Sequence, residues 1–166
     1  DRVLELLKIR PSVQDIPEAR PLPVVTGRVD YRDVSFAYGA DQPVLNHVSL
    51  SAEPGQTIAL VGLSGAGKTT LVNLLPRFYD VATGEILIDG VNIRQVTLQS
   101  LRRQIGIVPL ENVLFSGTLA ENIAFGQKEV KLADVEAAAR VANAHGFIRQ
   151  FSQGYHTWVG ERGVNL

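Results

Sequence analysis

The sequence has 166 residues, of which 45% are hydrophobic and 20% are charged, so it suffices for one folded domain and is unlike a disordered chain. Its net charge of −1 gives no electrostatic reason to expect nucleic acid or an anionic membrane surface as a partner. The lack of cysteine excludes disulfides and thiolate metal sites, and no apolar run approaches the roughly 18 residues of a membrane-spanning helix.

Residues 1–27 are predicted to precede the main domain. Apolar residues recur at helical spacing from Val3 to Ile9, and Pro11 ends that pattern. Residues 11–27 contain four prolines, which is typical of a linker. Because the chain begins with Asp1 and contains no methionine, we expect it to be a segment of a longer protein.

Five later segments have the character of strands. They are Val29–Tyr38, His47–Ala52, Thr57–Val61, Glu85–Asp89 and Ile105–Val108. The first alternates apolar and polar residues, which indicates a half-buried strand, whereas the third is a continuous apolar run typical of a strand buried on both faces. Asp89 and Gly90 form a turn pair that predicts a hairpin.

The helices are predicted from apolar periodicity and from capping residues. They cover Lys68–Leu75, Thr97–Arg103, Ala133–Ala144 and Phe147–Phe151. Thr97 is a candidate N-cap for the second of them. Thr118 and Glu121 have the spacing of a capping box and predict a further helix start.

The sequence from Gly62 to Thr69 is GLSGAGKT, which fits the phosphate-binding pattern G-x-x-x-x-G-K-[ST] without a mismatch. Glycines allow the tight turns that point several backbone N–H groups at phosphate oxygens, and the following helix directs its positive end there. We expect Lys68 to lie near the outer phosphates and the Thr69 hydroxyl to ligate Mg²⁺. The predicted nucleotide is Mg-ATP, and the residues expected to bind it are Gly62, Ser64, Gly65, Ala66, Gly67, Lys68, Thr69 and Thr70.

A P-loop NTPase also needs an acidic residue near the end of a neighbouring strand. Asp89 and Glu111 are the two candidates. Asp89 is better interpreted as a turn residue, because about twenty residues after the loop leave little room for a helix and a crossover. Glu111 falls beyond the end of the predicted strand Ile105–Val108. The residues alone therefore identify no convincing catalytic carboxylate.

Beyond the P-loop, much of the chain resembles the nucleotide-binding domain of ABC exporters whose membrane and ATPase parts share one polypeptide. The segments that carry the resemblance are VSFAY (34–38), VLNHVSL (44–50), PGQTIALVG (54–62), LLPRFYD (74–80), GEILIDG (84–90), LRRQI (101–105), LFSGT (114–118), ENI (121–123) and VGERG (159–163). The resemblance implies an α/β fold with a P-loop NTPase core and an antiparallel β subdomain. It also implies that Tyr38 stacks on adenine and that Asp89 lies outside the metal site.

The family resemblance assigns residues 28–166 to the N-terminal part of an ABC ATP-binding domain. The chain stops before the family's signature motif, Walker B strand and catalytic Glu, so we expect a fold incomplete at its C-terminus and no ATP turnover by this segment alone. The implied parent couples ATP binding and hydrolysis to transport. Its implied partners are a transmembrane domain of the same polypeptide and a second ABC domain in a head-to-tail dimer, at the cytoplasmic face of a membrane and without nucleic acid.

One position departs from the family pattern. Pro109 is followed by Leu110, where the family has the Gln that contacts Mg²⁺ and the attacking water. Leucine can do neither, so the alternative function is a non-hydrolysing half of a heterodimeric exporter. A P-loop kinase of small molecules would need an arginine-rich lid, for which the sequence offers no candidate.

Overall fold

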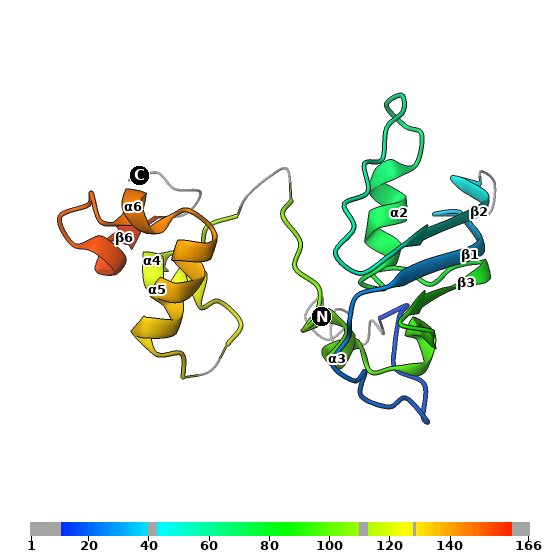
Figure 1. Cartoon of the computed structure of the whole chain (residues 1–166), viewed down its shortest axis with the longest axis horizontal. Coiled ribbons are helices and arrows are strands. Elements are labelled where there is room, and N and C mark those ends of the chain that lie inside the picture. The colour runs from blue at the N-terminus through cyan, green and yellow to red at the C-terminus, as the bar shows by residue number, and fades with distance from the viewer. Residues whose placement is uncertain (1–10, 40–42, 110–112, 128, 161–166) are drawn as a thin grey trace, which may run out of the picture. The chain divides into compact units, whose positions relative to one another are not determined.

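The computed structural model describes residues 11–39, 43–109, 113–127 and 129–160. The chain divides into two compact units, Asp1–Gly106 (unit 1) and Ile107–Leu166 (unit 2), as Figure 1 shows. Each unit has its own cluster of buried hydrophobic side chains. In the part of the chain that the structure describes, no helix is long and apolar enough to cross a membrane.

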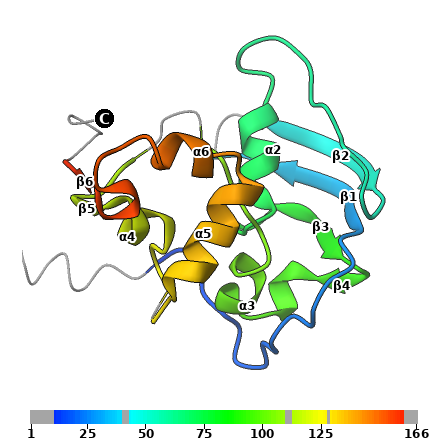
Figure 2. The same ribbon diagram turned by 60° about the vertical axis from the view of Figure 1, so that its left-hand side comes forward.

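Unit 1 is built on a four-stranded antiparallel sheet with the strand order β2-β1-β3-β4 (Figure 2). Its strands are β1 (Val29–Phe36), β2 (Leu45–Ala52), β3 (Thr83–Ile88) and β4 (Val91–Asn92). The strands β3 and β4 form the predicted hairpin, and its turn residues Asp89 and Gly90 have φ angles of 49° and 79°. Two left-handed residues are what an Asp-Gly hairpin turn requires. The predicted antiparallel subdomain is confirmed.

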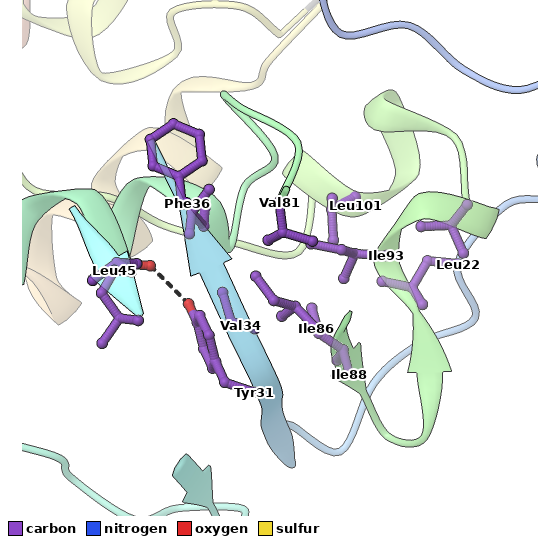
Figure 3. Close-up of a cluster of buried hydrophobic side chains, with 13 residues drawn as sticks. Leu22, Tyr31, Val34, Phe36, Leu45, Val81, Ile86, Ile88, Ile93 and Leu101 are labelled. Atoms are coloured by element: carbon purple, nitrogen blue, oxygen red, sulfur yellow. Dashed lines mark hydrogen bonds between the residues drawn. The ribbon is translucent and has the colours of Figure 1, made fainter. Parts of the chain in front are cut away.

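The helix α2 (Lys68–Leu74) begins at the end of the glycine-rich loop and packs on this sheet (Figure 1). The Tyr31 hydroxyl of β1 donates a hydrogen bond to the carbonyl oxygen of Leu71 at 2.8 Å (Figure 3). The shared core holds Leu22, Tyr31, Val34, Phe36, Leu45, Leu71, Leu74, Val81, Ile86, Ile88, Ile93, Val96 and Leu101. Each large side chain buried in such a core contributes about 1.5 to 3 kcal/mol, so the phosphate loop is anchored through its helix to the sheet.

The 3-10 turn η1 (Ile93–Gln95) leads into the short helix α3 (Leu98–Arg102). Thr97 is the N-cap residue, but its hydroxyl bonds to the Ser100 hydroxyl at 2.9 Å and makes no capping bond to the backbone. The cap comes from Asp15, whose carboxylate accepts a hydrogen bond from the Leu98 N–H at 2.7 Å. Thr97 is therefore the N-cap residue as predicted, but a carboxylate distant in sequence makes the capping hydrogen bond in place of its hydroxyl.

The proline-rich stretch 11–27 is part of unit 1 and packs on its core. Leu22 is buried in the core, and its N–H donates to the Ser100 hydroxyl at 2.8 Å. The Gln104 side chain accepts from the Val25 N–H at 2.9 Å and donates to the Pro23 carbonyl at 2.8 Å. This stretch is thus held by specific hydrogen bonds, which sequence composition did not indicate.

Unit 2 is mainly helical. Its elements are β5 (Gly117–Thr118), α4 (Leu119–Ile123), α5 (Leu132–Val141), α6 (His145–Ile148), η2 (Gly154–His156) and β6 (Trp158–Val159). The predicted capping box is confirmed: the Glu121 N–H donates to the Thr118 hydroxyl at 3.1 Å, and the Thr118 N–H donates to the Glu121 carboxylate at 2.7 Å. The helices of this unit pack around Leu119, Val135, Ala139, Ile148, Tyr155 and Val159.

Two helices in unit 2, predicted at Ala133–Ala144 and Phe147–Phe151, have different bounds in the structure, where they cover Leu132–Val141 and His145–Ile148. The helix α5 ends at Val141 and not at Ala144, because Asn143 takes a left-handed φ of 59° and the Ala144 N–H donates back to the Ala139 carbonyl at 2.8 Å. This arrangement is a Schellman-type helix end. The following helix therefore begins earlier than predicted, at His145.

Two predicted strands are not formed. Thr57–Val61 and Ile105–Val108 have no strand assignment, and no described residue pairs with them as a strand partner. Val61 is 89% exposed, so the burial on both faces expected for Thr57–Val61 is also wrong, and Val108 in the second segment is 93% exposed. A parallel strand takes its hydrogen bonds from neighbours distant in sequence, and the described residues supply none here.

Candidate phosphate-binding site

A hollow of about 490 Å³ opens beside the glycine-rich loop in unit 1. It is lined by Tyr38, Val44, Ser64, Gly65, Gly67, Lys68, Thr69 and Thr70. Six of these residues come from the phosphate-binding pattern and the threonine after it. The structure therefore brings Tyr38, which is distant in sequence, to the same hollow as the loop.

Two glycines give the loop its shape. Gly65 and Gly67 have φ angles of 81° and 83°, which side-chain-bearing residues rarely adopt. A Cβ atom on Gly67 would lie 2.9 Å from a methyl carbon of Leu45 and 3.1 Å from the Val44 carbonyl oxygen. A Cβ atom on Gly65 would meet nothing within 4 Å, so the space before the loop is open on that side.

Lys68 supplies the positive charge of the hollow. Its ammonium donates hydrogen bonds to the carbonyl oxygens of Gly62 at 2.8 Å and Leu63 at 2.7 Å. Both partners are neutral, and an anionic phosphate oxygen makes a stronger, charge-assisted bond. The ammonium can therefore exchange a loop carbonyl for a phosphate oxygen.

The remaining predicted loop residues have distinct places. Thr69 is exposed and lines the hollow, so its hydroxyl is accessible to a cation. Thr70 is buried, on the inner side of α2. Gly62 and Ala66 are not in the lining of the hollow; Gly62 holds the Lys68 ammonium, and the Ala66 N–H donates to the Leu63 carbonyl at 3.2 Å. These two residues shape the loop rather than face the hollow.

Tyr38 lies just beyond the end of β1 and is 55% exposed. Its ring makes T-shaped contacts with Phe36 and Tyr79, with centroid distances of 4.9 and 5.1 Å. Its hydroxyl lies 3.0 Å from the Thr70 hydroxyl oxygen. The sequence did not predict that Val44 lines the hollow or that Tyr79 contacts Tyr38, because neither residue belongs to the loop pattern.

Asp89 is engaged away from this hollow. Its carboxylate accepts hydrogen bonds from the Thr26 hydroxyl and the Arg28 N–H, both at 2.8 Å, and from the Gly27 N–H at 3.2 Å. Desolvation raises the pKa of this carboxyl, but the hydrogen bonds from Thr26, Arg28 and Gly27 together outweigh it and hold the pKa below its ordinary value. The ionised Asp89 thus ties the start of β1 to the hairpin.

Two further positions of interest in the sequence are Glu111, the second candidate acid, and Leu110, where the family has Gln. Leu110 and Glu111 lie outside the described residues. In the part of the chain that is described, no group of three or more His, Asp or Glu side chains could hold a metal ion. The Thr69 hydroxyl remains the one predicted metal ligand with a described position.

The family model of the ABC transporter matches residues 45–160, which is well over half of the chain. The chain belongs to the ABC transporter family. Its fold is accordingly that of the P-loop NTPase domain of ABC ATPases. The match includes the whole glycine-rich loop and begins at Leu45, the residue that packs against Gly67.

Relatives within the ABC transporter family are much longer than this chain. It is 48% identical to the ATP-dependent lipid A-core flippase of Syntrophus aciditrophicus, over 99% of this chain and 27% of that protein. It is also 48% identical to ATP-binding cassette sub-family B member 6 of Mus musculus, over 100% of this chain and 20% of that protein. The solved structure of a bacterial Atm1-family ABC exporter with ATP bound is 44% identical, with a TM-score of 0.89 and coverage of 99% of this chain and 29% of that one.

Proposed function

We propose that the chain binds Mg-ATP as the N-terminal part of the ATP-binding domain of an ABC exporter. The observation that carries this proposal is the hollow shared by the P-loop and Tyr38. Membership of the ABC transporter family and the names of its relatives support the same interpretation, although the chain spans only 20% to 29% of those proteins.

The residues of the hollow fit a nucleoside triphosphate with its Mg²⁺. The open side of Gly65 leaves room for phosphate oxygens close to the loop backbone, where the N–H groups and the start of α2 favour negative charge. Lys68 would bind an outer phosphate oxygen, and Thr69 would offer its hydroxyl to the cation, which neutralises phosphate charge when bound. Tyr38 would stack on the base.

In the proposed parent protein, this domain would act at the cytoplasmic face of a membrane. Its partners would be a transmembrane domain of the same polypeptide and a second ABC domain in a head-to-tail dimer. ATP binding would close the dimer, and hydrolysis would reopen it. The present segment carries the P-loop but no assigned catalytic carboxylate, so we expect it to bind ATP without turning it over.

Replacement of Lys68 tests the phosphate role. Lys68→Ala removes the charge that would meet the outer phosphates and should weaken Mg-ATP binding by about 3 kcal/mol, roughly 100-fold. Binding is measured by titrating a fluorescent ATP analogue. Lys131→Ala is the matched control, because Lys131 is an exposed lysine in unit 2 and should leave the affinity unchanged. Equal affinities of the Lys68→Ala form and the unsubstituted chain would overturn the proposal.

The second candidate function is the non-hydrolysing half of a heterodimeric exporter. Leu110 favours it, since leucine cannot ligate a cation or orient water where the family has Gln. In the complete ATP-binding domain, Leu110→Gln should leave ATP affinity similar and speed hydrolysis at least about tenfold, equivalent to about 1.4 kcal/mol of barrier. Equal hydrolysis rates would remove the support for this candidate.

A further inference from the structure

We propose that Thr70 is a positioning residue for the nucleobase: its hydroxyl holds Tyr38 in place, and so couples the base platform to the helix of the phosphate loop. This inference rests on the proposed function. In this role Thr70 acts on the nucleotide through the Tyr38 side chain. The sequence pattern predicts instead that Thr70 contacts a phosphate directly. The two roles make different predictions for ligands with and without a base.

The position of Tyr38 is not set by the sheet. The last ladder pair between β1 and β2 joins Phe36 to Leu45, and Tyr38 lies two residues beyond it. More than half of its surface is exposed, so packing alone leaves its ring free on one side. Its orientation therefore depends on the few side-chain contacts that it makes.

Among the side-chain contacts of Tyr38, the one with Thr70 is polar. The two hydroxyl oxygens lie 3.0 Å apart, within hydrogen-bond distance, and either can donate. Thr70 is 5% exposed, and its place on α2 is fixed because the neighbouring Leu71 is buried in the core of unit 1. A fixed, buried hydroxyl thus anchors the tip of an exposed ring.

Two aromatic side chains complete the support. Phe36 and Tyr79 both stand nearly perpendicular to the Tyr38 ring, with interplanar angles of 88°. Perpendicular pairs of this kind are favoured by the charge distribution of the rings, at about 0.5 to 1.5 kcal/mol each. With these contacts the ring has one preferred orientation, so a base that stacks on it meets a platform that is already ordered.

A base-free ligand separates this role from a direct phosphate contact. The affinities of Mg-ATP and of Mg-tripolyphosphate are measured by calorimetry on the full chain, unsubstituted and with Thr70→Val, Thr70→Ser or Tyr38→Phe. Thr70→Val should weaken Mg-ATP about fivefold and leave tripolyphosphate binding within about twofold. Thr70→Ser keeps the hydroxyl and should retain the ATP affinity. Melting temperatures report whether each variant folds.

The same bond can be removed from its other end. Tyr38→Phe keeps the exposed ring but loses the hydroxyl, so it should repeat the effect of Thr70→Val with little risk to folding. The double variant should bind ATP no more weakly than either single one, because both remove one interaction.

Three results would overturn the inference while leaving the proposed function intact: equal weakening of ATP and tripolyphosphate by Thr70→Val, unchanged ATP affinity in that variant, or losses that multiply in the double variant. An unsubstituted chain that binds neither ligand would instead overturn the proposed function, and the inference with it.

Discussion

Two regions of unit 1 that contain apolar residues differ in whether they form strands. The strands of the antiparallel sheet pair with one another and bury side chains in the core, whereas the more continuously apolar segment Thr57–Val61 is unpaired and exposed. The strands of a hairpin have partners a few residues away, but a parallel strand depends on a crossover and a distant partner. Hydrophobic content alone therefore does not make a strand; an available partner does.

The candidate site is anchored to the antiparallel sheet of unit 1. The glycine-rich loop packs through Gly67 against Val44 and Leu45, next to the start of β2, and its helix packs on the sheet through Leu71 and Leu74. None of these contacts needs Thr57–Val61 to be a strand. We therefore expect the hollow to keep its shape even where that segment lacks a partner.

The largest effect is expected from Gly84 of β3. A Cβ atom there would overlap the carbonyl oxygens of Arg32 and Asp33 in β1, and the φ of 78° adds backbone strain. Gly84→Ala should lower the free energy of unfolding by more than about 3 kcal/mol, measured by urea denaturation with far-UV circular dichroism. Gly55→Ala is the matched control: its φ of 74° is similar, but the added Cβ meets nothing within 4 Å, so about 1 kcal/mol is expected. Equal losses would show that β1 and β3 are not so closely apposed.

Two valines compare the paired and unpaired strands directly. Val34 of β1 is fully buried, and Val61 is 89% exposed. Val34→Ala should cost about 2 kcal/mol of unfolding free energy, because it leaves a cavity in the core, whereas Val61→Ala should change it by less than about 0.5 kcal/mol. A cost at Val61 as large as that at Val34 would mean that this segment is packed as a strand in solution.

Several features that sequence analysis predicted correctly have their partners near in sequence. The Asp89-Gly90 hairpin, the Thr118 capping box and the helix after Lys68 each depend on residues a few positions apart. The strands predicted at Thr57–Val61 and Ile105–Val108 were wrong, because the sequence indicated no partner for either of them. The α5 end was also missed, since Asn143 at a left-handed position is a weaker signal than glycine.

The candidate site was predictable in part for the same reason. The pattern from Gly62 to Thr69 indicated the loop, but Tyr38 came to it only through family resemblance. The contact between the Tyr38 and Thr70 hydroxyls joins residues 32 positions apart, and the spacing of residue types along the chain does not predict it. Asp89 was open to two interpretations until the N–H groups of Gly27 and Arg28 were seen to bind it.

A smaller effect is expected at the capping box of unit 2. Thr118→Ala removes the hydroxyl that accepts from the Glu121 N–H and should destabilise unit 2 by about 1 kcal/mol. The fluorescence of Trp158, the single tryptophan of the chain and a residue of unit 2, reports its unfolding. Thr118→Ser keeps a capping hydroxyl and should restore most of the stability. No change in the Thr118→Ala form would show that this helix start does not depend on its cap.

The smallest effect is expected in how the stability of the fold changes at acidic pH. Because the folded-state pKa of Asp89 lies below its unfolded value of about 3.9, the ionised carboxylate stabilises the fold above that pH, and this contribution is lost as the pH falls through the folded-state pKa. Asp89→Asn should therefore have a flatter decline of the urea midpoint below about pH 4 than the unsubstituted chain. Identical declines would indicate that the hydrogen bonds to Thr26, Gly27 and Arg28 do not favour the charged form.

The central claim is that a nucleotide binds between Tyr38 and the glycine-rich loop, and photolabelling with 8-azido-ATP tests it most directly. Trypsin releases Asp33–Lys68 as one peptide, and cleavage on the N-terminal side of Asp41 by an Asp-specific endopeptidase then separates Tyr38 from the loop. We predict an adduct in the part that ends at Ala40, abolished by excess unlabelled Mg-ATP. An adduct outside Asp33–Lys68, or one that excess Mg-ATP does not displace, would contradict the claim.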